Sequence, residues 1–256
     1  MKLYDSHAHY NDEKFADCRD TLLDEILSGG EVQRILNAGT DIRTSRECVD
    51  LCRRYEAFVC AVGIHPHECG DVPDKNAALD EVRRMLEYEK AVAIGEIGLD
   101  YHYDFSERSV QKDYFDAQMS LSEELGLPVV IHDREAHGDT FDMIKAHPNA
   151  FGVMHSYSGS AEQARQLVSL GWYISFSGSV TFKNAHNLRE AVTVVPDDRI
   201  LVETDCPYLA PVPVRGSLND SVKMKHTVGV LAEIRGEDPA KTAEITYENA
   251  VRLFGK

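Results

Sequence analysis

The segment "AVAIGEIG" (residues 91–98) has the apolar pattern of a buried strand, and "ERSVQKDYFDAQMSLSEELG" (residues 107–126) has the pattern of an amphipathic helix. Gly126 supplies a stop for this helix, which places four apolar side chains on one face: Val110, Tyr114, Ala117 and Leu121. A second strand pattern, "PVVIHDR" (residues 128–134), follows directly. Strand, helix and strand in this order predict a βαβ unit with parallel strands.

The same alternation continues through the rest of the chain. Further strand patterns occupy residues 2–7, 32–39, 58–66, 151–159, 172–178 and 200–207. Eight such units in 256 residues favour a closed (β/α)₈ TIM barrel over an open doubly wound sheet, which usually has fewer strands and a nucleotide-binding loop. Neither the dinucleotide-binding glycine pattern nor the P-loop pattern occurs. We therefore expect an α/β fold with one TIM-barrel domain over residues 1–256.

Composition narrows the class of protein. The chain is 43% apolar and 27% charged, which is typical of globular proteins, and it has neither a bilayer-length apolar run nor an export signal. We expect a cytoplasmic protein with no membrane partner and no obligate protein partner. The net charge of -16 opposes binding to long polyanions, unless divalent cations and a few arginines invert the local potential.

Polar side chains that can bind metal occur at or just after the ends of several predicted strands. They are His7, His9, Glu96, His132, His155 and Asp205, and in addition His65 and His67 follow the third predicted strand. Because the carboxyl ends of all strands in a parallel barrel open on one face, we expect these side chains to meet there. Four imidazoles and two carboxylates suffice for two divalent ions (Mg²⁺, Mn²⁺ or Zn²⁺) if Glu96 bridges them. Asp205 could bind metal and also orient or deprotonate water. The predicted catalytic residues are therefore Asp205 and the bridging Glu96.

Each of these residues alone is more often an ordinary polar group than a metal ligand. The metal interpretation is favoured because the groups follow buried apolar runs, where an unpaired charge would be costly. Arg134 and Arg215 could bind a substrate phosphate, although each could equally form a surface salt bridge. Three tyrosines could stack on bases, although packing is the commoner role: Tyr101, Tyr157 and Tyr208.

Several longer motifs resemble the TatD family of metal-dependent deoxyribonucleases: "DSHAH", "AVGIHPH", "GEIGLDYHYD", "VVIHDRE", "HSYSG" and "ETDCPYLAP". The resemblance covers essentially the whole chain. It implies a TIM-barrel hydrolase with a dinuclear site that cleaves phosphodiester bonds at DNA ends or in short oligonucleotides, as a 3′ to 5′ exonuclease. The family's ligands fall on the same six residues, and His65 becomes a candidate contact to the substrate phosphate. The family's "RGKRNEP" is "RGSLND" here, which keeps Arg215 but loses two cations.

Two alternatives remain open at this stage. The same kind of site can hydrolyse esters or amides, as in a D-aminoacyl-tRNA deacylase, and the fold does not separate these reactions. A metal-binding or nucleic-acid-binding protein without catalysis is the third possibility, and Asp205 as a candidate base argues against it.

Overall fold

The computed structural model describes residues 1–255 as alternating strands and helices. The strands are β1 (Leu3–Ala8), β2 (Val32–Ala38), β3 (Phe58–Val62), β4 (Ala91–Asp100), β5 (Val129–Arg134), β6 (Gly152–Met154), β7 (Tyr173–Phe176) and β8 (Ile200–Val202). The α-helices are α1 (Arg19–Ser28), α2 (Ile42–Arg54), α3 (Lys75–Met85), α4 (Arg108–Leu125), α5 (His137–Ala146), α6 (Ala161–Ser169), α7 (His186–Val194), α8 (Met224–Arg235) and α9 (Pro239–Phe254).

The strands form one eight-stranded sheet in which the spatial order is the sequence order, β1 to β8. The pairs β1–β2, β3–β4, β4–β5, β5–β6 and β7–β8 are all parallel. A parallel bridge between Ala8 and Cys206 joins the end of β1 to the segment after β8. This arrangement is the predicted (β/α)₈ barrel.

By its internal contacts the chain divides into two compact units, and the prediction of a single domain stays a prediction. The first comprises Met1–Asn37 and the chain from His155 onward, and the second is Ala38–Met154. No helix within residues 1–255 is long and apolar enough to cross a lipid bilayer.

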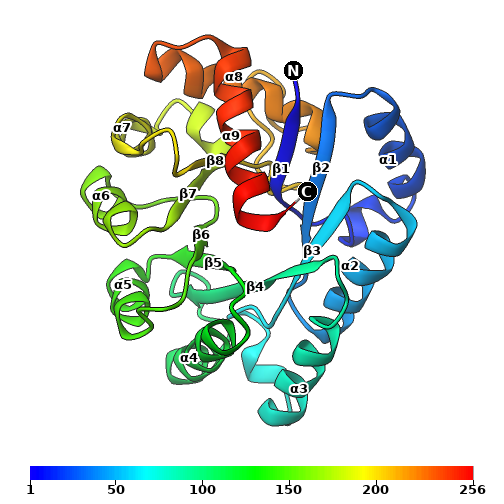
Figure 1. The fold of residues 1–256 in the computed structure, drawn as a ribbon, viewed down its shortest axis with the longest axis vertical. Helices are drawn as coiled ribbons and strands as arrows, with labels where there is room; N and C mark the ends of the chain where they lie inside the picture. Colours follow the sequence, from blue (N-terminus) through cyan, green and yellow to red (C-terminus); the bar gives the residue numbers. More distant parts are fainter. Residues whose placement is uncertain (256) are drawn as a thin grey trace. The chain divides into compact units, whose positions relative to one another are not determined.

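The first unit is built on β7, β8, β1 and most of β2 (Figure 1). Its last helix, α9, contacts β1 and β8, and Tyr4 of β1 packs near Tyr247 and Phe254 of that helix. Asp238 caps α9 by accepting a hydrogen bond from the Ala240 N–H, as expected of Asp at the N-cap. The helix predicted for the C-terminal segment is therefore present.

The second unit is built on β3 to β6, and its longest helix is α4. This helix ends at Gly126, whose φ of 64° is readily adopted only by glycine, as the sequence predicted. The buried face differs from the predicted one, because it includes Gln111 and Gln118. The Gln118 amide accepts from the Ile64 N–H (2.8 Å) and donates to the Ile64 carbonyl (3.0 Å). These buried glutamines satisfy the backbone of neighbouring loops, which an apolar side chain could not do.

The fourth strand, β4, is longer than predicted, and its extra length affects the site. β4 runs to Asp100, so Glu96 lies inside the strand and not at its end. Gly98 permits this extension, because a Cβ atom there would lie 1.9 Å from the His132 carbonyl oxygen of β5. Every second residue of a strand lies on the same side, so Glu96, Gly98 and Asp100 share one side of β4. This side therefore carries two carboxylates.

Candidate metal centre

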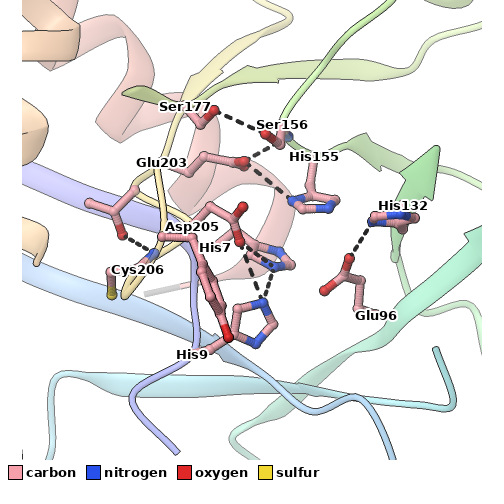
Figure 2. A network of polar contacts seen from close by, with 12 residues as sticks. His7, His9, Glu96, His132, His155, Ser156, Ser177, Glu203, Asp205 and Cys206 are labelled. Atoms are coloured by element: carbon pink, nitrogen blue, oxygen red, sulfur yellow. Dashed lines mark hydrogen bonds and ion pairs between the residues drawn. The ribbon is translucent and has the colours of Figure 1, made fainter. Parts of the chain in front are cut away.

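The two histidines of the first strand lie side by side in the first unit. His7 is fully buried in β1, and His9 is the first residue after it. Their Nε2 atoms are 3.0 Å apart (Figure 2). Residues at i and i+2 share one side of an extended chain, which is why the two rings meet. Two imidazole nitrogens this close can bind the same cation.

Asp205 and His155 complete what we call the first histidine group (His7, His9, His155 and Asp205). Asp205 Oδ1 lies 3.5 Å from His9 Nε2 and 3.9 Å from His7 Nε2. Ligand atoms of these three residues all lie within 4.8 Å of one another. The His155 ring stacks on His7 with centroids 3.9 Å apart. This mixed imidazole and carboxylate set suits Zn²⁺ or Mn²⁺.

Asp205 is the carboxylate of this group that water can reach, with 16% of its side chain exposed. Burial acts to raise its pKa, but the hydrogen bond from His9 and the nearby His155 and His7 outweigh burial and lower the pKa. Its backbone has a φ of 57°, and its N–H donates to the His7 carbonyl (2.9 Å). Asp205 is therefore ionised at neutral pH and fixed against β1.

A buried carboxylate in β1, Asp5, holds the backbone that carries Asp205. Its oxygens accept from the Thr204 N–H (2.9 Å), the Thr204 hydroxyl (2.7 Å) and the Ser221 hydroxyl (2.7 Å). Burial raises the pKa of Asp5 to about 7, although these hydrogen bonds oppose the shift. Asp5 thus ties β1 to two segments from the far end of the chain.

Glu203 supports His155 in a similar way. Its Oε1 accepts the Ser156 N–H at 2.6 Å and lies 3.3 Å from His155 Nδ1 (Figure 2). Glu203 is fully buried. A carboxylate on the far nitrogen of a metal-binding histidine orients the ring and raises its basicity. Glu203 is placed to do this for His155.

The second unit carries its own cluster, the second histidine group (His65, His67, Glu96, Asp100 and His132). His132 Nδ1 lies 2.9 Å from Glu96 Oε1, and its Nε2 lies 3.0 Å from Asp100 Oδ2. The same Asp100 oxygen is 2.8 Å from His67 Nε2. His65 Nε2 lies 3.3 Å from Glu96 Oε1. Three imidazoles here have ligand atoms within 4.8 Å of one another: His65, His67 and His132.

Asp100 determines which nitrogen of His132 can bind metal. Burial acts to raise the Asp100 pKa, but hydrogen bonds from His132, the Tyr103 N–H and His67 lower it well below its usual range. The ionised carboxylate can only accept, so the His132 Nε2 must carry a proton. Its Nδ1 faces Glu96 and would carry the lone pair when a cation lies between the two groups. This arrangement fits the prediction of His132 and Glu96 as ligands.

His65 has the opposite arrangement. Burial lowers its pKa to about 3, so the ring is neutral at physiological pH despite the opposing effect of Glu96. Its Nδ1 accepts the His67 N–H at 3.1 Å. The single proton is therefore on Nε2, which makes His65 a hydrogen-bond donor and not a metal ligand through that nitrogen.

The predicted arginines lie apart from these contacts. Arg134 lies over the ring of Tyr103 (4.7 Å) and Arg215 over that of Phe182 (4.2 Å). Both side chains are exposed, and neither guanidinium group forms a hydrogen bond or ion pair with any residue in 1–255. Of the tyrosines considered for stacking, Tyr157 is only 5% exposed, which agrees with the commoner role of packing.

Two supporting residues were not predicted from the sequence: Asp100 and Glu203. Alternation along β4 was an available signal for Asp100, because it lies four residues after Glu96 on the same side of the strand. His67 was expected among the metal-binding side chains after the third predicted strand, and it lies in the second histidine group beside Asp100. The role of Glu203 depends on a contact between distant segments, which no local pattern shows.

A parallel barrel with imidazole and carboxylate side chains at the carboxyl ends of its strands is an architecture of metal-dependent hydrolases. Comparison with known proteins agrees with this class. A family model described as "TatD related DNase" matches residues 4–255. YabD of Bacillus subtilis, named as an uncharacterized metal-dependent hydrolase, is 39% identical over 257 residues, which cover 98% of each chain.

Two further relatives are informative. A Cronobacter sakazakii protein named "3'-5' ssDNA/RNA exonuclease TatD" is 32% identical over 99% of this chain and 98% of its own. The crystal structure of YjjV, a TatD homologue from Escherichia coli K12, superimposes with a TM-score of 0.91 at 28% identity, covering 99% of this chain and 98% of that chain. The chain belongs to the TatD family of metal-dependent hydrolases, as its motifs indicated.

Proposed function

We propose that the protein is a 3′ to 5′ exodeoxyribonuclease that removes nucleotides from single-stranded DNA ends or short oligonucleotides. The observation that carries the proposal is the pair of histidine groups, in each of which imidazole and carboxylate ligand atoms converge. The printed activity of the Cronobacter relative supports the choice of nucleic acid as substrate. The family description supports the same choice.

Two divalent ions are the proposed cofactors. Their ligands are the six residues predicted from the sequence: His7, His9, Glu96, His132, His155 and Asp205. The donor chemistry fits, because neutral imidazoles and ionised carboxylates are the ligands that Zn²⁺ and Mn²⁺ accept, and Mg²⁺ less tightly. Bound divalent cations polarise a phosphoryl oxygen and make water acidic enough to react at neutral pH.

Side chains of this protein would handle the proton and the substrate. Asp205 is ionised and partly exposed, so one of its oxygens can accept the proton of the attacking water. His65 can donate its Nε2–H to a phosphate oxygen, which is the contact that the resemblance to the family implies. Arg134 and Arg215 are exposed guanidinium groups that can bind phosphate with paired N–H donors. These local cations offset part of the unfavourable net charge of -16.

The test is gel analysis of a 5′-labelled single-stranded oligonucleotide incubated with metal-stripped protein, before and after Mg²⁺ or Mn²⁺ is restored. We expect a ladder that shortens from the 3′ end only when metal is present. Glu96→Ala should give no ladder, and its metal content, measured by mass spectrometry, should fall as well. An intact oligonucleotide with fully metal-loaded wild-type protein would refute the nuclease proposal, and hydrolysis of a D-aminoacyl-tRNA ester would then identify the alternative activity.

A further inference from the structure

Two exposed aromatic rings lie on the loop that follows β4. Phe105 and Tyr103 stack with centroids 5.2 Å apart and planes 16° apart, and they are 69% and 47% exposed. We propose that these rings, together with Arg134, form a stacking platform for an unpaired base of the substrate; this inference rests on the proposed function. We call Tyr103, Phe105 and Arg134 the aromatic platform.

The loop that carries the platform is fixed by hydrogen bonds. Asp100 Oδ1 accepts the Tyr103 N–H at 2.9 Å. The Ser106 hydroxyl donates to the His67 carbonyl at 3.1 Å, and Gln111 of α4 donates to the Ser106 carbonyl at 2.8 Å. The rings therefore occupy a defined position before any ligand arrives, which lowers the entropy cost of binding.

The platform adjoins the second histidine group. The His67 ring stands edge-on to Phe105, with centroids 4.9 Å apart, and edge-on to Tyr103 at 5.5 Å. His67 Nε2 is held by Asp100, the carboxylate that also binds His132. A base stacked on the outer face of Phe105 therefore lies beside residues proposed to bind metal and phosphate. This is where the nucleotide of a phosphodiester substrate has to lie.

The charge at the platform favours a ligand that is both aromatic and anionic. The Arg134 guanidinium lies 4.7 Å from the Tyr103 centroid and has no hydrogen-bonding or ion-pair partner within residues 1–255. By contrast, Arg108 at the start of α4 is bound by Asp104. In a chain of net charge -16, an arginine without an acidic partner beside a stacked aromatic pair is suited to a nucleotide, which offers a base and a phosphate together.

Another exposed tyrosine does not offer the same surface. Tyr208 is 44% exposed, but its hydroxyl donates to Asp12 (2.7 Å) and Lys14 lies 4.0 Å from its ring centroid. Phe151 is 41% exposed and lies directly before β6, at the amino end of that strand. Phe151 therefore resembles Phe105 in residue type and exposure but not in position, which makes it a matched control.

The experiment measures binding of a short single-stranded oligonucleotide whose 3′-terminal base is 2-aminopurine and whose last linkages are phosphorothioates. Stacking on an aromatic ring quenches 2-aminopurine fluorescence. With Mn²⁺-loaded protein we expect Phe105→Leu to raise the Kd roughly tenfold and to remove most of the quenching. Phe105→Trp and Phe151→Leu should keep the Kd within about twofold of wild type. An oligonucleotide with abasic residues at its 3′ end should bind all four proteins alike.

The outcomes separate this inference from the proposed function. Unchanged binding by Phe105→Leu, or an equal loss of affinity for the abasic oligonucleotide, would overturn the platform even if wild-type protein cleaves DNA. Quenching by wild type that Phe105→Leu abolishes, without cleavage of an ordinary oligonucleotide, would support the platform and refute the nuclease. Circular dichroism melting of each variant identifies any loss of affinity that comes from unfolding.

Discussion

The two histidine groups use carboxylates in opposite ways. Asp100 of the second group is fully buried, and one of its oxygens contacts two imidazoles at 2.8 and 3.0 Å. Asp205 of the first group is partly exposed, and its imidazole contacts are longer, at 3.5 and 3.9 Å. The hydrogen-bonding capacity of Asp100 is used within the protein, whereas Asp205 is partly exposed and lies among ligand atoms that could hold a cation. The difference separates a carboxylate that is placed to orient imidazoles from the carboxylate that we propose takes part in the reaction.

The variant Asp205→Asn is expected to have the largest effect, and it tests whether Asp205 is the proton acceptor. The amide cannot accept a proton at neutral pH but can still coordinate through its oxygen, so we expect the rate of DNA cleavage to fall about 10²- to 10⁴-fold. Metal content should fall much less than the rate. Metal content and kcat are measured on the same preparation. Full activity in this variant would show that Asp205 is not the proton acceptor.

The variant Asp100→Asn tests whether Asp100 positions the imidazole of His132. Without the carboxylate, the Nε2 proton of His132 loses its charged acceptor, and we expect metal affinity or activity to fall about 10- to 100-fold. Chelator competition measures the affinity. The matched control is Glu123→Gln, which alters a contact between a carboxylate and His147 (3.0 Å) elsewhere in the same unit. Equal losses in both variants would mean that Asp100 has only a general structural role.

Glu203→Gln asks whether the first group also depends on a positioning carboxylate. The amide oxygen can still accept the Ser156 N–H, but the charge beside His155 Nδ1 is lost. We expect metal affinity to fall about tenfold. This is the lower end of the range that is typical when a residue hydrogen-bonded to a metal ligand is changed. Titration of metal-stripped protein with Mn²⁺ gives this value. A loss as large as that of Asp205→Asn in kcat would instead place Glu203 in the reaction.

The smallest effect is expected from an ion pair outside both groups. The carboxylate of Asp133, 2.8 Å from His137 Nδ1, raises the pKa of His137. Because the folded-state pKa lies above the unfolded one, the stabilisation is complete below about pH 6.5 and is lost as pH rises through the folded-state value. His137→Ala should therefore lower the free energy of unfolding by up to about 1 kcal/mol at pH 5.5 and less at pH 8.5. Urea unfolding at both pH values measures this; a cost that does not change with pH would exclude the ion pair as its source.

Much of this architecture was predictable from local pattern. The barrel follows from repeated apolar strands and amphipathic helices, and the prediction of the six ligand residues used their position after buried runs. The extension of β4 from Gly98 to Asp100 was not predictable, because it depends on the close approach of Gly98 to His132 in the neighbouring strand. The contact of one Asp100 oxygen with both His67 and His132 was not predictable either, because it depends on packing between β4, β5 and the loop after β3. The choice between packing and stacking for Tyr157 likewise depends on tertiary structure, because it is decided by burial of a loop residue.

The hydrogen bonds of Asp5 have a consequence for how the protein is made. Thr204, whose hydroxyl binds Asp5, lies 199 residues further along the chain. A ribosome has therefore synthesised every residue of the second histidine group, from His65 to His132, well before it reaches Thr204 and Asp205. The carboxylate proposed to accept the proton joins His7 and His9 late in translation. A nascent chain consequently lacks a complete set of the proposed catalytic residues until Asp205 has been made.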